Sequence, residues 1–303
     1  MKIQISVLLL TFTISFASAQ KSSREMLYQK THAQIIDILA ASPALSGFMA
    51  IDLTSGEKFS YNPDVVFTQA SAIKIPILME VYKQAHDKKF SLNDVRKIES
   101  ANIVGGSGVL NTFTDPSSLT IRNIATLMIV LSDNTATNAL IDLVGLAAIN
   151  TTLKSLGMKD TRVQRKMIDQ AASGRGDENI STPAEAARLL QMLYKGEFID
   201  KTTSSEIISI LKKNGREGSR IAAGIPENVP VAFKPGGLNG VSTEWTIVLL
   251  KERPYAVAIM ENYKILGQPD RTMEKVSAIL YQYFWRLGNA TRYGAYVDPS
   301  LIK

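Results

Sequence analysis

The chain has 303 residues, a formal net charge of +6 and no cysteine. Its lysines and arginines are scattered, with no basic run interleaved with aromatic residues, so we expect no nucleic-acid partner. Without cysteine the chain forms no disulfide, and a chain of this length must therefore be held together by its hydrophobic core.

The first residues predict an export signal. Residues 1–19 carry one charge, at Lys2, followed by an apolar run that ends in Ala17-Ser18-Ala19, the small-x-small pattern that signal peptidases cleave. A membrane anchor is the alternative, but the run is shorter than the roughly 20 residues of a spanning helix and contains Thr and Ser. We therefore expect a signal peptide over residues 1–19 and an exported mature chain, periplasmic or secreted.

The segment that follows predicts one helix and one hairpin. Residues 23–42 carry apolar side chains at helical spacing, and Ser22 or Ser23 can cap the start of that helix. Residues 47–64 alternate around a Thr-Ser-Gly turn, as the two strands of a hairpin do.

From about residue 70 to residue 213 the apolar spacing is helical. Helices are predicted over residues 72–87, 120–132, 136–145, 182–196 and 204–214. In one of them Thr182 is the predicted N-cap, Pro183 takes the first helical position and Glu185 completes a capping box.

The end of the chain returns to strands. Residues 244–252 and 255–262 predict two strands, and residues 271–287 predict a closing helix. The fold class that follows is α/β (α+β): an antiparallel sheet from both termini, flanked by helices, with an inserted all-helical lobe. The sheet lobe should comprise residues of about 20–65 and 214–303, the helical lobe residues of about 66–213, and a cleft should lie between them.

Several catalytic systems are absent from the sequence. His32 and His86 are the two histidines, and neither has a second histidine or a cysteine at metal-ligand spacing. No G-x-S-x-G elbow and no glycine-rich nucleotide motif after a strand occur. We therefore expect no metal, no cofactor and no histidine-based triad.

Ser71 and Lys74 offer a different chemistry. A serine hydroxyl needs an adjacent base, and a lysine can be that base when burial or a nearby positive charge lowers its pKa. Three residues apart at the start of a helix, the two side chains share one face, and the apolar residues after Lys74 would bury that turn. Such a pair suits acyl transfer without histidine.

Three motifs in order give the chain a resemblance to a family. Ser71-Ala72-Ile73-Lys74 is followed by Ser132-Asp133-Asn134 and then by Lys234-Pro235-Gly236. This series resembles the S-x-x-K, S-D-N and K-T-G motifs of the class A β-lactamases and serine penicillin-binding proteins. The resemblance covers nearly all of the mature chain. It implies the β-lactamase/transpeptidase-like fold and a monomeric protein.

The resemblance also implies roles for these residues. Ser71 would be acylated, Lys74 would accept its proton, Ser132 would relay a proton to the leaving nitrogen, and Lys234 would hold the substrate carboxylate. The substrate-binding residues implied are Asn134, Gly236 and Gly237, where Gly237 would share the oxyanion hole with the Ser71 N–H.

The chain departs from the family pattern at two places. Pro235 stands where the family has Thr or Ser, so one hydrogen bond to a substrate carboxylate is missing. The loop between the second and third motifs lacks the E-x-x-L-N pattern whose glutamate clears the acyl-enzyme, and Lys166 falls near that place.

Three acidic residues of this loop are candidates for the missing base. Asp169 is the nearest, and Asp177 and Glu178 follow. Each could instead pair with a basic residue of the loop, which we favour for acidic residues beside arginine. These basic residues are Arg165, Lys166 and Arg175.

Two substrate classes and three functions therefore stay open. The chain could hydrolyse β-lactams, it could be a D-alanyl-D-alanine peptidase acting on peptidoglycan stem peptides, or it could bind either ligand without turnover. A binder needs no nucleophile, so the motifs favour an enzyme, and a β-lactam hydrolase is the interpretation we prefer.

Overall fold

The structure, a computed structural model, describes residues 22–115, 117–267 and 271–296. The predicted signal peptide of residues 1–19 lies outside the described residues. Among those described, no single helix is long and apolar enough to cross a bilayer, although the bent pair of helices Asn134–Val144 and Leu146–Ser155 passes by length and composition alone.

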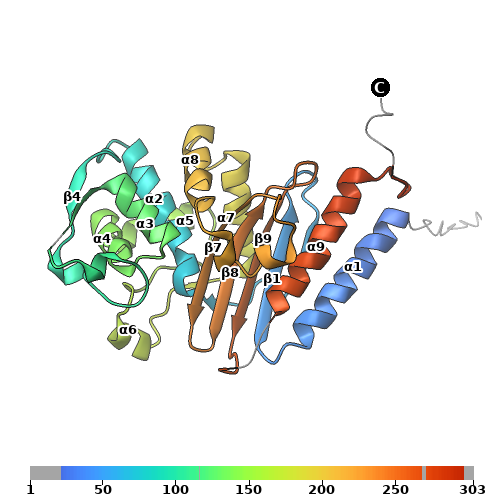
Figure 1. Cartoon of the computed structure of the whole chain (residues 1–303), viewed down its shortest axis with the longest axis horizontal. Helices are drawn as coiled ribbons and strands as arrows, with labels where there is room; N and C mark the ends of the chain where they lie inside the picture. Colours follow the sequence, from blue (N-terminus) through green and yellow to red (C-terminus); the bar gives the residue numbers. More distant parts are fainter. Residues whose placement is uncertain (1–21, 116, 268–270, 297–303) are drawn as a thin grey trace, which may run out of the picture.

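A five-stranded antiparallel sheet is built from both ends of the chain, as predicted (Figure 1). Its strands are β1 (Leu45–Asp52), β2 (Lys58–Tyr61), β7 (Val231–Leu238), β8 (Val241–Val248) and β9 (Tyr255–Asn262). They lie in the order β2-β1-β9-β8-β7, so β7, which carries the third motif, is an edge strand.

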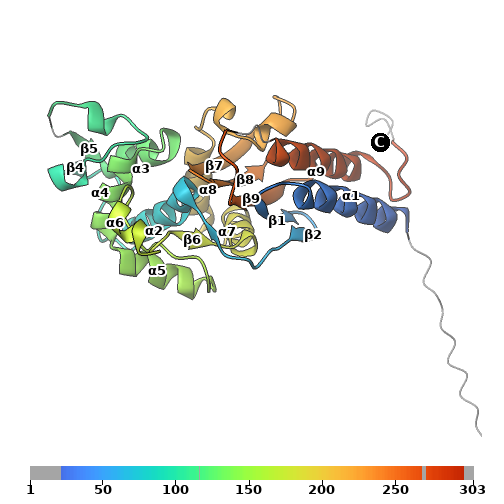
Figure 2. The same ribbon diagram turned by 90° about the horizontal axis from the view of Figure 1, so that it is seen from below.

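Both faces of the sheet are covered. Along β1, Phe48 and Ala50 pack toward the terminal helices, while Met49 and Ile51 pack toward the other face, because successive side chains of a strand point to opposite sides. The terminal helices are α1 (Ser23–Ala40) and α9 (Thr272–Asn289), which lie side by side (Figure 2). Ser22 caps α1, with its hydroxyl accepting from the Glu25 N–H, as the sequence predicts.

The inserted segment is mostly helical. Its helices are α2 (Lys74–His86), α3 (Ile121–Val130), α4 (Asn134–Val144), α5 (Leu146–Ser155), α6 (Gln170–Gly174), α7 (Pro183–Lys195) and α8 (Lys201–Leu211). Two short ribbons accompany them: β3 (Phe67–Thr68) pairs with β6 (Ile180–Ser181), and β4 (Val95–Lys97) pairs with β5 (Ser118–Thr120).

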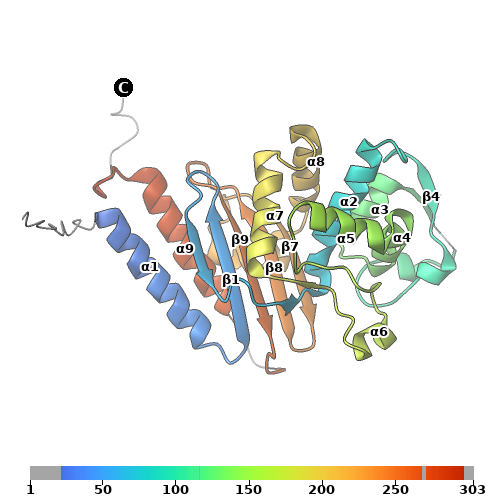
Figure 3. The same ribbon diagram turned by 180° about the vertical axis from the view of Figure 1, so that it is seen from behind.

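Helix α7 contacts the sheet although the sequence analysis counted it in the helical lobe. It packs on β1 and β9, on the face opposite α1 and α9 (Figure 3). Thr182 caps it and Pro183 opens it, as predicted. The capping-box bond predicted between the Thr182 N–H and the Glu185 carboxylate is wrong. That carboxylate instead accepts from the N–H groups of residues 159–161 and so holds the start of the loop that follows those residues.

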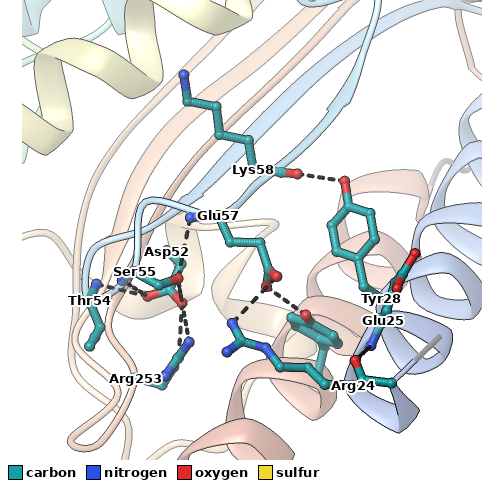
Figure 4. A network of polar contacts seen from close by, with 11 residues as sticks. Arg24, Glu25, Tyr28, Asp52, Thr54, Ser55, Glu57, Lys58 and Arg253 are labelled. Atoms are coloured by element: carbon teal, nitrogen blue, oxygen red, sulfur yellow. Dashed lines mark hydrogen bonds and ion pairs between the residues drawn. The ribbon is translucent and has the colours of Figure 1, made fainter. Parts of the chain in front are cut away.

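The hairpin turn between β1 and β2 is tied to both terminal helices (Figure 4). Buried Asp52 accepts from the N–H groups of Thr54 and Ser55 and pairs with Arg253 at 2.8 Å. Glu57 pairs with Arg24 of α1 and accepts from the Tyr283 hydroxyl of α9. These bonds give the turn residues a structural role, at the end of the sheet lobe remote from the three motifs.

Candidate active site

Ser71 lies in a 3-10 turn, Ala70–Ile73, that leads directly into α2. Buried Gln69 fixes this turn to the sheet: its side chain donates to the Phe67 carbonyl and accepts from Trp245 Nε1, and its carbonyl accepts from Thr243 Oγ1. Ala70 adopts a positive φ of 46°, unusual for a residue with a side chain. The turn is therefore held from the side of β8, a role for Gln69 that the sequence motifs did not reveal.

Gly236 allows strand β7 to lie against the Ser71 turn. A Cβ at this position would meet the Gln69 carbonyl oxygen at 2.5 Å and the Ala72 nitrogen at 2.8 Å. Gly236 is buried and, unlike Gly237, does not line the cleft described below. Its place in the motif is explained by close packing, and the substrate contact predicted for it stays a prediction.

Lys74 is fully buried behind Ser71. Its ammonium donates to the Ser132 carbonyl at 2.7 Å, to Ser132 Oγ at 3.1 Å and to Asn134 Oδ1 at 2.9 Å. Burial, and then the nearby charge of Lys234, lower the pKa of Lys74 well below its ordinary value. Within the described residues the Ser71 hydroxyl makes no hydrogen bond.

Ser132 lies between two lysines. Its Oγ also lies 3.1 Å from Lys234 Nζ, so both lysine nitrogens are within hydrogen-bond distance of this one hydroxyl. A hydroxyl in that place can pass a proton between a lysine and a third group. Burial lowers the pKa of Lys234 to about 7, so this lysine changes charge near neutral pH.

Asp133 and Asn134 shape the neighbouring loop. Asp133 caps α4 through the Ala136 N–H, and its second oxygen accepts from the N–H groups of Val109 and Leu110. The Asn134 amide donates to the Gly105 carbonyl at 3.1 Å while its oxygen accepts from Lys74. Asp133 is therefore structural, and Asn134 joins the loop to the buried lysine.

Pro235 is compatible with its place because β7 is an edge strand. N–H groups of a strand alternate between its two neighbours, and proline is tolerated only where its missing N–H faces away from the ladder. The Gly237 N–H, two residues on, therefore shares that open side and is not used by the ladder with β8. It is free to bind an oxyanion in the cleft that Gly237 lines.

Arg220 is a cleft residue that the sequence analysis missed. A Cβ at Gly237 would lie 3.9 Å from Arg220 Nη2, so the guanidinium group lies beside the third motif. Fully buried Glu244 holds its backbone, accepting from the Arg220 N–H at 2.8 Å and from the Ser219 hydroxyl. No motif marks Arg220, because only the tertiary fold brings it to β7.

The charged residues of the loop over residues 164–179 are mostly engaged with each other. Glu178 pairs with Arg165 at 2.7 Å and Asp177 pairs with Arg175 at 3.0 Å, as the interpretation that we favoured predicts. Asp169 caps α6 by accepting from the Ala172 N–H at 2.9 Å.

Lys166 is not the loop residue that faces the motifs. It pairs with Asp142 at 2.6 Å and also donates to Asn102. Met167 is buried and lines the cleft instead, held by two backbone bonds to the Asn138 side chain. The prediction that the glutamate's place falls near Lys166 stays a prediction, and of the two neighbouring side chains it is Met167 that lines the cleft.

A cleft of about 1010 Å³ is lined both by the Ser71 turn and by the loop of residues 164–179. Ser71, Asn134, Met167, Asp169 and Gly237 all line it. The buried ammonium groups of Lys74 and Lys234 lie behind this lining. Within the described residues, no group of three or more histidine, cysteine, aspartate or glutamate side chains could hold a metal ion.

Comparisons with known proteins agree with this geometry. Residues 30–284 match the model of a beta-lactamase enzyme family. An imipenem-hydrolyzing beta-lactamase of Enterobacter cloacae is 27% identical over 241 residues, 77% of this chain and 82% of that protein. Beta-lactamase SME-1 of Serratia marcescens is 28% identical over 244 residues, 78% of this chain and 83% of that protein.

Solved structures show the same fold. The structure of a PBP-A mutant, an acyl-enzyme complex with penicillin G, has a TM-score of 0.78 at 25% identity and covers 85% of this chain and 97% of its own. A beta-lactamase of Sphaerobacter thermophilus has a TM-score of 0.74 at 30% identity and covers 86% of this chain and 97% of its own.

Proposed function

The chain belongs to the beta-lactamase enzyme family, and from that premise we propose that it hydrolyses the amide bond of β-lactams through an ester on Ser71, with hydrolysis of that ester as the slow step. The observation that carries the proposal is the placement of Ser132 Oγ between two buried lysines, next to the turn that holds Ser71.

Acylation follows from these contacts. Neutral Lys74 accepts the Ser71 proton as Oγ attacks the β-lactam carbonyl carbon, which forms a tetrahedral oxyanion. The N–H groups of Ser71 and Gly237 stabilise that oxyanion. The carbon–nitrogen bond then breaks, Ser132 gives its hydrogen to the leaving nitrogen, and Ser132 is reprotonated from a lysine beside it. The product is an ester on Ser71 and an amine within the opened ring.

Two cations support binding of the substrate carboxylate. Arg220 lies beside Gly237 at the cleft surface, and Lys234, a buried residue of β7, has a pKa of about 7. Because Pro235 offers no hydroxyl, these charges take the place of the hydrogen bond that Thr or Ser would make.

Hydrolysis of the ester needs an activated water, and the loop offers poor candidates. Its buried residues that line the cleft, Met167 and Asn179, are not bases, and Glu178 is paired with Arg165. Lys166 is paired with Asp142. Asp169 lines the cleft but is exposed and caps α6. The base is then a group such as Lys74 or solvent itself, which supports slow deacylation.

A D-alanyl-D-alanine peptidase is the second candidate. The same loop composition favours it, since a peptidase that transfers its acyl group to an amine does not depend on a water-activating carboxylate.

Intact-mass spectrometry with benzylpenicillin tests the proposal. We expect the mass of one ring-opened penicillin to be added within seconds and to disappear over minutes to hours as penicilloate accumulates. A Ser71→Ala variant should add no mass. A permanent adduct together with cleavage of a D-alanyl-D-alanine peptide would favour the peptidase, and an adduct on the alanine variant would contradict Ser71 as nucleophile.

Export is part of the proposal as well. The pattern at Ala17-Ser18-Ala19 supports cleavage after residue 19, which matches a substrate met outside the cytoplasm. N-terminal sequencing of the mature protein from the native host should begin at Gln20, and an intact Met1 would contradict this.

A further inference from the structure

The carboxylate of Glu244 is buried next to the third motif, and the steps proposed above do not use it. Glu244 lies in β8 directly opposite Pro235 of β7, and its side chain is fully buried. Within the described residues, no lysine or arginine side chain forms an ion pair with it. A buried carboxylate without such a partner is stable only when hydrogen bonds satisfy it, so its donors identify the segment that it holds.

The donors to Glu244 come mainly from one short segment. One carboxylate oxygen accepts from the N–H groups of Arg220 at 2.8 Å and Ile221 at 3.4 Å. The other oxygen accepts from the hydroxyl of Ser219 and from that of Thr246, the latter at 3.1 Å. The carboxylate therefore attaches residues 219–221 to the sheet.

This attachment fixes the backbone of Arg220 while its guanidinium group stays available. Arg220 lines the cleft, and its Nη2 would lie 3.9 Å from a Cβ at Gly237. In the part of the chain that the structure describes, no carboxylate forms an ion pair with this guanidinium group. A cation whose backbone is held before the ligand arrives loses less freedom on binding, which strengthens its contact with an anionic ligand.

Lys234 is the second cation that Glu244 affects. Lys234 lies opposite Trp245 in the β7–β8 ladder, so its side chain and that of the adjacent Glu244 point to opposite faces of the sheet. Burial lowers the pKa of Lys234, and the negative charge of Glu244 raises it. Burial raises the pKa of Glu244, whereas the hydrogen bonds from Ser219 and Arg220 and the charge of Arg220 lower it. Arg220 and Lys234 are thus the two cations whose charges act on Glu244.

We propose that Glu244 is a positioning residue for substrates that carry a carboxylate, because it fixes the backbone of Arg220 and keeps a negative charge near Lys234. Glu244 is fully buried and does not line the cleft, so it acts through these two cations and does not touch the substrate. The inference rests on the proposed function. Without Glu244, Arg220 would be held less firmly and Lys234 would carry its proton less often, so anionic substrates would lose more than neutral ones.

Benzylpenicillin and its methyl ester provide the test, because they differ only at the carboxylate. The second-order rate constant of acylation is measured for each by intact mass after rapid mixing, with the native protein and with Glu244→Gln. In the native protein the acid should react faster than the ester. In Glu244→Gln the rate constant of the acid should fall about 10-fold, the size of effect expected when a hydrogen bond to a charged group is lost, and that of the ester should change little.

The pH profile of acylation provides a readout that a merely structural role would not move. For benzylpenicillin, the fall of the rate constant on the alkaline side should move to lower pH in Glu244→Gln, because burial then lowers the pKa of Lys234 without an opposing negative charge. Glu244→Asp keeps the charge and should leave this fall near its native pH. Glu274→Gln, which removes a carboxylate of α9 that pairs with Arg271, is the matched control and should keep the acid-to-ester ratio and the pH profile.

Ser219→Ala provides a milder variant in case Glu244→Gln does not fold, which circular dichroism would show. It removes one donor to the carboxylate and should lower the acid-to-ester ratio by a smaller amount.

The outcomes separate this inference from the proposed function. Acylation of the native protein by neither compound would refute the proposed function itself. Equal rate constants for acid and ester in the native protein would overturn the role of Glu244 and leave Ser71 as the nucleophile. The same conclusion would follow from equal losses for both compounds or an unmoved pH profile in Glu244→Gln, or, if that variant does not fold, from an unchanged ratio in Ser219→Ala.

Discussion

The two sides of the cleft use their charged groups in different ways. Near Ser71, the polar groups of Lys74, Ser132 and Lys234 form one connected set in which both lysines are buried. On the loop of residues 164–179, Glu178 and Asp177 are paired with arginines of the same loop. The first side has groups placed for proton transfer, whereas the second uses its acids to hold its own shape.

This difference teaches that the two halves of a hydrolytic cycle can be built independently. In the proposed mechanism, acylation uses residues held at the starts of α2 and α4 and in β7. Ester hydrolysis would be assisted by a base on the loop, and there Met167 lines the cleft. The predictions below test first the acylating side and then the loop.

Removing the base should have the largest effect. Lys74→Met should slow acylation by benzylpenicillin by about 10³-fold, because general bases contribute 10² to 10⁴. Lys83→Met, at an exposed position near the end of the same helix, is the control and should acylate normally. Fast acylation by the Lys74 variant would show that another group takes the Ser71 proton.

Placing a carboxylate at position 167 should give the loop a group that accepts a proton, as the Ser71 side of the cleft already has. Met167→Glu is expected to speed ester hydrolysis by about 10²-fold, the ordinary contribution of a general base. Met167→Gln has the same shape without a base and should not speed it. Equal rates for the two variants, measured as loss of the adduct mass, would mean that position 167 does not reach the ester.

The charge of Lys234 should determine how the rate constant of acylation falls on the alkaline side of its pH profile. With a pKa of about 7, this lysine is charged below pH 7 and neutral above it, so the rate constant for carboxylated substrates should fall as pH rises, by up to about tenfold per pH unit. Lys234→Arg stays charged and should lose this limb. A limb near pH 7 that survives in the arginine variant would assign it to another group.

The loss of the Lys234 proton should also make the free energy of unfolding depend on pH. Between pH 7 and about 10 the unfolded chain keeps the Lys234 proton while the folded chain releases it, so the free energy of unfolding should rise with pH. Urea denaturation at several pH values is measured for the native protein and for Lys234→Met. The free energy of unfolding should rise less with pH in the variant. Identical pH slopes would contradict the lowered pKa.

Position 235 should have a modest effect on binding. Pro235→Thr restores a hydroxyl on the edge strand, and one hydrogen bond to the substrate carboxylate should tighten binding by about 0.5 to 1.5 kcal/mol. Competition with a fluorescent penicillin measures the change. Unchanged binding would mean that the carboxylate is held by the cations alone.

Asp169 should have the smallest effect on chemistry. Asp169→Asn keeps an N-cap for α6 and should leave ester hydrolysis unchanged, whereas Asp169→Ala should lower stability by about 1 kcal/mol. Slower loss of the adduct in the asparagine variant would instead make Asp169 the base.

Much of the fold could be predicted because its signals are local. Periodicity found the hairpin and most of the helices, but not α5 or α6. The caps at Ser22 and Thr182 are short-range patterns. The motifs located Ser71 and Lys234 because their spacing matches a known series.

What the sequence could not supply are contacts between distant segments. The bond between Gln69 and Trp245, the approach of Arg220 to Gly237 and the attachment of Glu185 to residues 159–161 all depend on the folded chain. The sequence also could not show that Met167, rather than Lys166, lines the cleft, because Lys166 is turned away by its ion pair with Asp142 of a distant helix.

Burst kinetics with benzylpenicillin test the central claim most directly. The mature protein is mixed with excess substrate, and opening of the β-lactam ring is followed from milliseconds to minutes by absorbance. A fast phase equal to one substrate molecule per protein, followed by a much slower steady rate, is the result expected from rapid acylation of Ser71 and a loop without a water-activating carboxylate. Fast linear turnover without a burst would contradict the account, because hydrolysis of the ester would then be as fast as its formation.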